Sequence, residues 1–236
     1  MLKHKPEQTL LVLDTATESC SVALWHNQHV YSRYEVCPQQ HSQRILPMIQ
    51  SVCDEAGLAL GDINILGFGH GPGSFTGVRI AIATVQGLAF GLDVPVVGVS
   101  TMLAMAEEVA SATSDDDILV AIDARMNEVY FAHYKRVGEK LELQGKESVL
   151  APENAREYIS QIATPAFAGT GWQAYNELSE LLPQPGEELS VTLPNAKWML
   201  PEVERAIHEQ RLQSIMDVKP VYLRDTVTWK KLPGRE

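Results

Sequence analysis

Short apolar runs alternate with longer segments of helical periodicity along the first half of the chain. Residues 10–16 (LLVLDTA) form a continuous apolar run, which is typical of a buried strand. Four more strands are predicted from similar runs, at residues 21–25, 30–36, 63–69 and 94–99. Three helical segments lie among them, near residues 41–57, 78–91 and 101–112. This alternation of strand and helix predicts an α/β lobe.

The first helical segment begins near His41 and ends at Gly57, a residue type that often terminates helices. Pro47 has no N–H to donate, so we expect an irregular opening turn or a regular helix that starts close to this residue. Apolar residues recur on one helical face, at Ile45, Ile49, Val52, Cys53 and Ala56. The segment is therefore predicted to be an amphipathic helix.

The opening pattern returns after the acidic stretch at residues 114–117. Residues 118–123 (ILVAID) form an apolar strand that ends in Asp123, and residues 128–134 alternate as a second strand does. The same order of strand, aspartate, polar turn and strand surrounds Asp14 in the first half. This repeat predicts two lobes from a duplicated α/β unit.

We therefore expect an N-terminal lobe over residues 1–113, a C-terminal lobe over residues 114–215, and a tail over residues 216–236 that packs back on the first lobe. Within the second lobe, helices are predicted at residues 152–162, 172–182 and 198–209, a strand at residues 166–169, and a loop at residues 183–193. The patterns that indicate helices and strands are weaker in this lobe than in the first.

Composition sets the broad class of the protein. The 236 residues are 45% hydrophobic and 21% charged, as in ordinary globular proteins. No apolar run approaches the roughly 20 residues that a membrane span needs, and the polar opening does not resemble a signal peptide. We therefore expect a cytoplasmic protein with no membrane contact. The net charge of -11 argues against direct nucleic-acid binding without a basic partner.

The strongest candidate for chemistry is a glycine-rich turn between a strand and a helix, GHGPGSFTG at residues 69–77. Such a turn lets the backbone approach an anion beside free N–H groups of the helix start. It is not a Walker A loop, because no Gly-Lys-Ser/Thr follows. The alternative interpretation is a tight turn with a helix N-cap. Both remain open.

Strand-end aspartates complete the candidate site. Asp14 and Asp123 hold positions where carboxylates of α/β proteins face ligands and, through water, Mg²⁺; the alternative is a turn or cap role. Residues 168–171 repeat the strand–glycine–helix order and are a candidate contact for adenosine. The candidate nucleotide or phosphate site, which we expect to be vestigial, comprises Asp14, Thr15, Gly71, Gly73, Ser74, Thr76, Asp123, Gly169 and Gly171.

Metal ligands and nucleophiles are scarce. The chain has no H-E-x-x-H motif, and the two histidines three residues apart, His26 and His29, lie in a predicted hairpin turn. Only His70, beside the glycine turn, is placed to face a ligand. A G-x-S-x-G nucleophile elbow is also missing. The cysteines Cys20, Cys37 and Cys53 are widely spaced without a C-x-x-C pair, so we expect reduced packing residues. No metal site and no self-contained hydrolase are predicted.

The second helical segment is rich in small residues, which allow close helix packing. With the first helix it is predicted to form a flat surface for a partner, and the alternative is packing onto the sheet. The predicted interface comprises Ile45, Ile49, Val52, Ile80, Ala83, Thr84 and Gly87.

Several segments together resemble the bacterial TsaB (YeaZ) family: LDTATESCSVAL, HSQRILPMI, GHGPGSFTGVRIAIATVQGLA, VVGVSTM and DARMNEVY. The resemblance covers the first 135 residues closely and the remainder loosely. It implies an actin-like ATPase (ASKHA, hexokinase/Hsp70 superfamily) fold with two lobes. It also implies a non-catalytic subunit needed to form N6-threonylcarbamoyladenosine at position 37 of tRNA (t6A37).

In that family the partners are TsaD, which performs the transfer, and TsaE, which joins in a ternary complex. The resemblance implies a TsaD heterodimer, a homodimer when the protein is alone, and tRNA contact only through TsaD. No cofactor is implied as required, and weak ATP or ADP binding is expected. The mildly basic tail is the one stretch suspected of touching RNA, or else a solvated end, through Lys219, Arg224, Lys230, Lys231 and Arg235.

One departure from the catalytic relative carries a physical argument. TsaD-like proteins have two metal-binding histidines one helical turn apart, where this sequence has Thr101 and Met105. A hydroxyl and a thioether do not replace two imidazoles on such a metal, so we expect no transfer chemistry here. The alternative function is an independent ATP-dependent phosphotransferase or ATPase that uses Asp14 and the glycine turn. A metallopeptidase is disfavoured by the lack of ligands.

Overall fold

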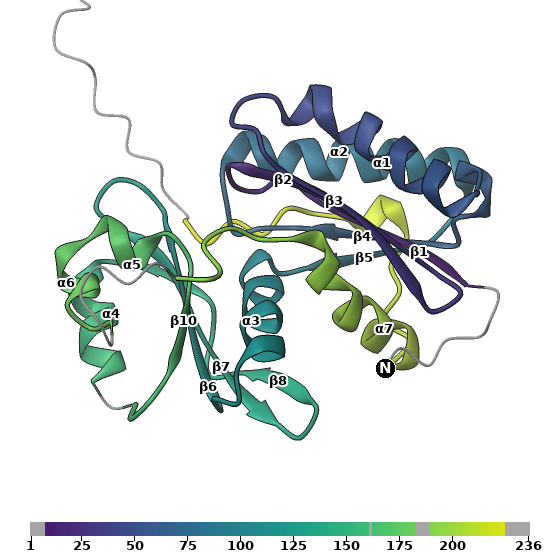
Figure 1. Cartoon of the computed structure of the whole chain (residues 1–236). Coiled ribbons are helices and arrows are strands. Elements are labelled where there is room, and N and C mark those ends of the chain that lie inside the picture. Colours follow the sequence, from purple (N-terminus) through teal and green to yellow (C-terminus); the bar gives the residue numbers. More distant parts are fainter. Residues whose placement is uncertain (1–7, 161, 183–188, 225–236) are drawn as a thin grey trace, which may run out of the picture.

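The computed structural model describes residues 8–160, 162–182 and 189–224 and contains two lobes side by side, each built on a β-sheet (Figure 1). The sheet of the first lobe has the strand order β3-β2-β1-β4-β5. Its strands are β1 (Thr9–Asp14), β2 (Ser19–His26), β3 (His29–Val36), β4 (Ile65–Gly69) and β5 (Val96–Val99). β1 pairs antiparallel with β2 and parallel with β4, and β3 and β5 extend the sheet at its two edges.

Two helices cover one face of this sheet, α1 (His41–Ala56) and α2 (Phe75–Leu92), with the short 3₁₀ turn η1 (Leu60–Asp62) between them (Figure 1). α1 ends at Gly57 in the left-handed conformation, as predicted. The helix is regular from His41 through Pro47, contrary to the predicted irregular opening. Pro47 lies on the exposed side of α1, where water can satisfy the carbonyl that its missing N–H leaves free.

The sheet of the second lobe contains β6 (Asp117–Asp123), β7 (Val129–Val137), β8 (Lys140–Leu143), β9 (Ser148–Leu150) and β10 (Ala166–Ala168). α3 (Thr101–Ala112) covers one face, and α4 (Pro152–Ile159), α5 (Gly171–Ala174) and α6 (Asn176–Ser179) cover the other. The single helix predicted at residues 172–182 is therefore wrong. Tyr175 has an extended backbone that separates α5 from α6, and its hydroxyl donates to Asp123 Oδ1 at 2.8 Å.

The predicted duplication is visible in the topology. β6 pairs antiparallel with β7 and parallel with β10, just as β1 pairs with β2 and β4. Asp14 and Asp123 end the two equivalent strands, β1 and β6. The two lobes therefore share one α/β unit, as their sequence pattern indicates.

The last described segments return to the first lobe. The 3₁₀ turn η2 (Ala196–Met199) and α7 (Leu200–His208) pack on the sheet face opposite α1 and α2, against Leu10 and Val12. The 3₁₀ turn η3 (Ile215–Asp217) packs beside α2. The expected C-terminal lobe over residues 114–215 is thus too long, because the apolar open face of the first sheet needs a cover that local pattern does not reveal.

α2 is the one helix among the described residues that is long and apolar enough to cross a membrane, with a mean hydropathy of 1.4 over 18 residues. The sequence pattern did not indicate a possible membrane span at this helix. Val78, Ala81, Ile82 and Val85 bury its inner side in the core of the first lobe. Length and composition alone are weak evidence for a span, and this helix covers a sheet.

Candidate functional site

A cavity of about 1070 Å³ lies between the two lobes. Its walls come from the turn after β1, the start of α2, the turn after β6, and the segment near the end of the described chain. Among the lining residues are Ala16, Thr17, Glu18, His41, Gly73, Ser74, Phe75, Asp123, Arg125, Tyr130, Thr170, Val221, Tyr222, Leu223 and Arg224. The duplicated turns thus face each other across this cleft, as expected for ligand sites at the carboxyl ends of strands.

The glycine turn fixes the start of α2 against the turn after β1. Ser74 is the N-cap of α2, and its Oγ accepts a hydrogen bond from the Gly77 N–H at 3.1 Å. A Cβ at Gly73 would lie 2.3 Å from the Ala16 carbonyl oxygen, and one at Gly77 would lie 2.0 Å from that of Thr15. These glycines are therefore required by close contact between two backbone segments of the chain itself.

Asp14 and Thr15 do not reach the cavity, contrary to their predicted ligand-facing roles. Both have no exposed surface. Asp14 Oδ1 accepts from the Ala16 N–H at 2.9 Å, and burial raises the pKa of this carboxyl to about 6. The Thr15 hydroxyl donates to the Gly77 carbonyl at 2.7 Å. Both residues therefore hold the first turn in place within the protein.

Asp123 does line the cavity, but its carboxylate is occupied. Oδ1 accepts from the Tyr175 hydroxyl and from the Arg125 N–H, each at 2.8 Å. Oδ2 accepts from the Arg125 guanidinium at 2.8 Å, and the same guanidinium lies 3.2 Å from Glu18 across the cleft. The two equivalent turns are thus joined by an ion pair of the chain's own side chains.

The structure brings Gly73, Ser74 and Asp123 of the predicted site to the cavity wall. Gly169 and Gly171 pack against Ala121 instead, where a Cβ at Gly169 would lie 2.1 Å from the carbonyl oxygen. Gly71 lies against Val221, and Thr76 is exposed on the first turn of α2. The predicted set is therefore divided between a cavity wall and structural contacts.

Other residues of the cavity were missed. His41 is 7% exposed, and its Nε2 has no hydrogen-bond partner among the described residues. Arg125 lies within the DARMNEVY segment, so its place beside Asp123 could have been predicted from the sequence. Tyr222 gave no sequence signal, and Arg224 was predicted only as part of the basic tail. Only the folded chain brings both residues to the cleft.

The remaining candidates for chemistry do not line the cavity. Burial lowers the pKa of His70 to about 4, so its ring is neutral near pH 7. The three cysteines are free and buried, and burial raises the pKa of Cys20 to about 12. The part of the chain that the structure describes contains no group of three His, Cys, Asp or Glu residues placed to hold a metal ion.

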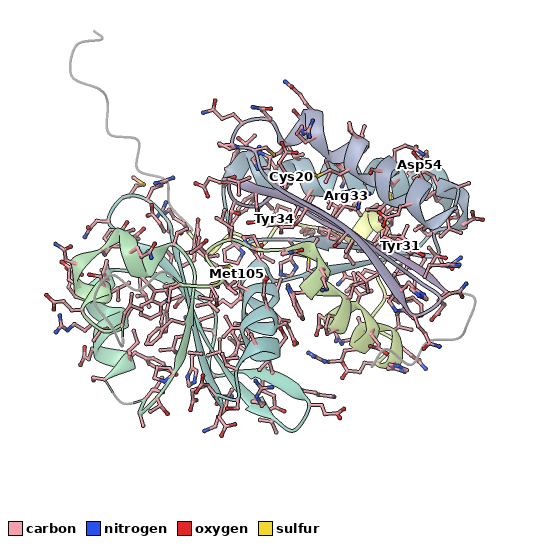
Figure 2. All side chains as sticks on the ribbon, in the orientation of Figure 1. Cys20, Tyr31, Arg33, Tyr34, Asp54 and Met105 are labelled. Carbon is pink, nitrogen blue, oxygen red and sulfur yellow. The ribbon has the colours of Figure 1, made fainter. Side chains whose placement is uncertain are left out.

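Thr101 and Met105 lie in the first turns of α3, which begins with Ser100 as its N-cap. Neither side chain has any exposed surface, and Met105 belongs to the core of the second lobe (Figure 2). The Thr101 hydroxyl lies 3.5 Å from Asp14 Oδ2. These positions are therefore filled by packing rather than open to a ligand.

The outer side of α2 is the apolar surface that the sequence predicted in part. Ala83 and Gly87 are exposed, Ile80 and Thr84 are half-buried, and Phe90 is 82% exposed. A Cβ at Gly87 would meet no atom within 4 Å, so this side of the helix is open. We refer to Ile80, Ala83, Thr84, Gly87 and Phe90 as the α2 face.

The contribution predicted for α1 is wrong. Ile45, Ile49 and Val52 are at most 2% exposed and pack against the first sheet. The same periodicity that marks an apolar helix face marks the face that a sheet covers, and the sheet covers this one. On the outer side of α1, the large apolar residue exposed to solvent is Leu46, at 57%.

Comparison with known proteins places this fold and cleft in a family. The family model described as TsaD, tRNA N6-adenosine threonylcarbamoyltransferase, matches residues 28–234. A protein of Escherichia coli K12 named tRNA threonylcarbamoyladenosine biosynthesis protein TsaB is 46% identical over 96% of this chain and 99% of its own length. The chain belongs to the TsaB family.

Further relatives agree with the TsaB assignment. The protein of the same name from Haemophilus influenzae is 42% identical over 97% of this chain and 98% of its own. The solved structure of YeaZ from Pseudomonas aeruginosa has a TM-score of 0.78 and 40% identity, covering 92% of this chain and all of that one. The resemblance inferred from sequence motifs is confirmed, and so is the two-lobed actin-like ASKHA fold of the TsaB family.

Proposed function

We propose that this chain works in t6A37 formation on tRNA as a non-catalytic subunit that binds TsaD and supports it together with TsaE. The observation that supports a role in this pathway is the 46% identity, over nearly the full length of both chains, to a protein named for threonylcarbamoyladenosine biosynthesis. The structure adds support for the accessory role and for the surface that binds the partner.

The accessory role is supported at the first turns of α3. The two positions at which the TsaD-like pattern has histidines hold Thr101 and Met105, and core packing covers both side chains. The buried Asp14 likewise offers no carboxylate to a metal-bound nucleotide. This burial also argues against an independent ATPase or phosphotransferase that uses Asp14.

The α2 face supports a protein partner. An exposed Phe90 on the same helix as the exposed Ala83 and the open Gly87 gives α2 an apolar strip on its outer side. Aromatic side chains anchored in such surfaces dominate many protein interfaces. We propose that TsaD covers this face in the heterodimer, and that a second copy of the chain covers it when TsaD is absent.

We propose no resident cofactor, and at most weak ATP or ADP binding in the cleft. The α2 N-terminus is a favourable place for phosphate, but Arg125 is already paired with Asp123 and Glu18. With a net charge of -11, we propose that tRNA is held through TsaD, in the cytoplasm. Within the basic tail, Arg224 is paired with Glu128, and Lys230, Lys231 and Arg235 lie outside the described residues.

Size-exclusion chromatography with light scattering tests this proposal, on the chain alone and mixed with its cognate TsaD. A one-to-one heterodimer is expected for the native chain. Ala83→Glu places a charge on the α2 face and should abolish it, whereas Asn154→Glu adds the same charge to an exposed site on α4 and should not. An Ala83→Glu variant that binds TsaD normally contradicts the proposed surface, and a native chain that does not bind contradicts the proposed function.

A further inference from the structure

Residues 218–224 cross from the first lobe to the second along the rim of the cavity, and we call them the strap. Val218 is buried in the core of the first lobe beside α2. The Val221 N–H then donates to the His70 carbonyl at 3.0 Å, and Leu223 packs on the core of the second lobe. The final four residues of the strap all line the cavity. Moving the strap would therefore open one wall of the cleft.

The first anchor of the strap is on α2. Tyr222 stacks on Phe75, with ring centroids 5.7 Å apart and planes 25° apart. The Arg79 guanidinium lies 3.6 Å from the centroid of Phe75, and its Nε donates to the Tyr222 hydroxyl at 3.0 Å. Phe75 and Arg79 belong to the first turns of α2, just before Ile80 of the α2 face. A partner on that face would lie next to this anchor.

The second anchor is on the turn after β6. Arg224 Nε donates to Glu128 Oε2 at 3.0 Å, and the same guanidinium donates to the Ala124 carbonyl at 3.1 Å. The Arg224 side chain is only 18% exposed, so water screens this pair less than a surface pair. The contact fixes the turn that also presents Asp123 and Arg125 to the cleft.

We propose that the strap couples occupation of the α2 face by a protein partner to closure of the cleft between the lobes. A partner that immobilises the first turns of α2 also immobilises Tyr222, and through Arg224 it restrains the turn at residues 124–128. The coupling is a physical connection between two sites rather than a shared binding surface. It rests on the proposed function only for the identity of the partner, TsaD.

Hydrogen–deuterium exchange of the full chain tests the second anchor without any partner. Arg224→Ala should raise exchange at residues 124–128 by at least tenfold, because the turn loses its clamp. Met216→Ala is the matched control, since this residue is 83% exposed just before the strap, and it should leave exchange there unchanged. Unchanged exchange in Arg224→Ala overturns the proposal. Arg224→Lys, which keeps the charge but loses the fork, should give an intermediate rise.

The same measurement with TsaD tests the coupling. TsaD should slow exchange at residues 124–128 of the native chain by at least threefold, although the proposed partner surface, the α2 face, does not include them. Tyr222→Ala should lose this slowing while still binding TsaD, and Tyr222→Phe, which keeps the stacking, should retain most of it. Full slowing in a TsaD-bound Tyr222→Ala variant overturns the coupling alone. A native chain that fails to bind TsaD contradicts the proposed function and the coupling together.

Discussion

The Thr101 hydroxyl lies 3.5 Å from the Asp14 carboxylate, and neither residue has any exposed surface. Asp14 ends β1 and Thr101 begins α3, so the contact joins the first sheet to the helix that leads into the second lobe. A fully buried carboxylate with so few donors is costly to ionise. The aspartate that the sequence predicted to face a ligand is thus part of the interior, and its raised pKa follows from that burial.

Replacing Asp14 by Asn is expected to stabilise the protein increasingly as the pH rises. Burial raises the pKa of this carboxyl from 3.8 to about 6, so the folded state binds the proton more tightly than the unfolded state does. Stability from this group is therefore lost as the pH rises through that interval. Between pH 4 and pH 7 the difference in free energy of unfolding between Asp14→Asn and the native chain should shift by roughly 2.5 kcal/mol in favour of the variant. Urea unfolding at several pH values measures this difference, and a constant difference would contradict a buried, weakly acidic Asp14.

Two glycines of α2 are expected to respond in opposite directions to alanine. At Gly77 a Cβ would lie 2.0 Å from a backbone oxygen, that of Thr15, which has no freedom to move aside. Gly77→Ala should lower the free energy of unfolding by roughly 3 kcal/mol or more, the scale of severe overpacking. A Cβ at Gly87 would have no atom within 4 Å. Gly87→Ala should therefore raise the free energy of unfolding by about 1 kcal/mol, because alanine has the higher helix propensity. Denaturant unfolding of both variants checks the pair; equal effects would show that the turn is not tightly packed.

A half-buried carboxylate links β7 to the start of α3. Glu147 accepts hydrogen bonds from the hydroxyls of Tyr134, at 2.6 Å, and Ser100, the N-cap of α3. Burial raises the pKa of Glu147, and these two donors oppose the rise. Tyr134→Phe should therefore cost about 1–3 kcal/mol of stability and raise that pKa further.

A double-mutant cycle separates this hydrogen bond from packing. With Glu147→Gln the acceptor is neutral, so the cost of Tyr134→Phe should fall below half of its value in the native background. Unfolding by urea at pH 7 gives all four free energies. An unchanged cost would mean that the Tyr134 hydroxyl stabilises the fold through a contact other than the one with Glu147.

Much of the fold was accessible to sequence pattern because its signals are local. The range predicted for α3, residues 101–112, is that of the structure, since a serine cap and an apolar face mark it. The duplicated strands were visible because each is an unbroken apolar run that ends in aspartate. The return of α7 to the first sheet was not visible, because no local pattern says which of two apolar surfaces a helix will cover.

The site was predicted less completely for the same physical reason. Whether Asp14 faces a ligand or the core depends on Thr101, which is far away in sequence. The glycines of the turn were recognised, but a glycine required by a ligand and one required by a neighbouring backbone look alike in sequence. Arg224 reached the cleft through an ion pair with Glu128 that only the tertiary structure forms.

Phe90 provides a quantitative test of the α2 face. Its ring is 82% exposed, so truncation removes no core packing and should leave the thermal midpoint within about 2 °C of the native value. If TsaD covers this ring, Phe90→Ala should weaken the heterodimer by at least tenfold, in the range of an interface anchor. Calorimetric titration with TsaD measures the affinity. Val137→Ala is the control, because Val137 is an exposed apolar residue on β7 of the second lobe and should have no effect. Equal affinities of the two variants for TsaD would show that the partner surface on α2 does not include Phe90.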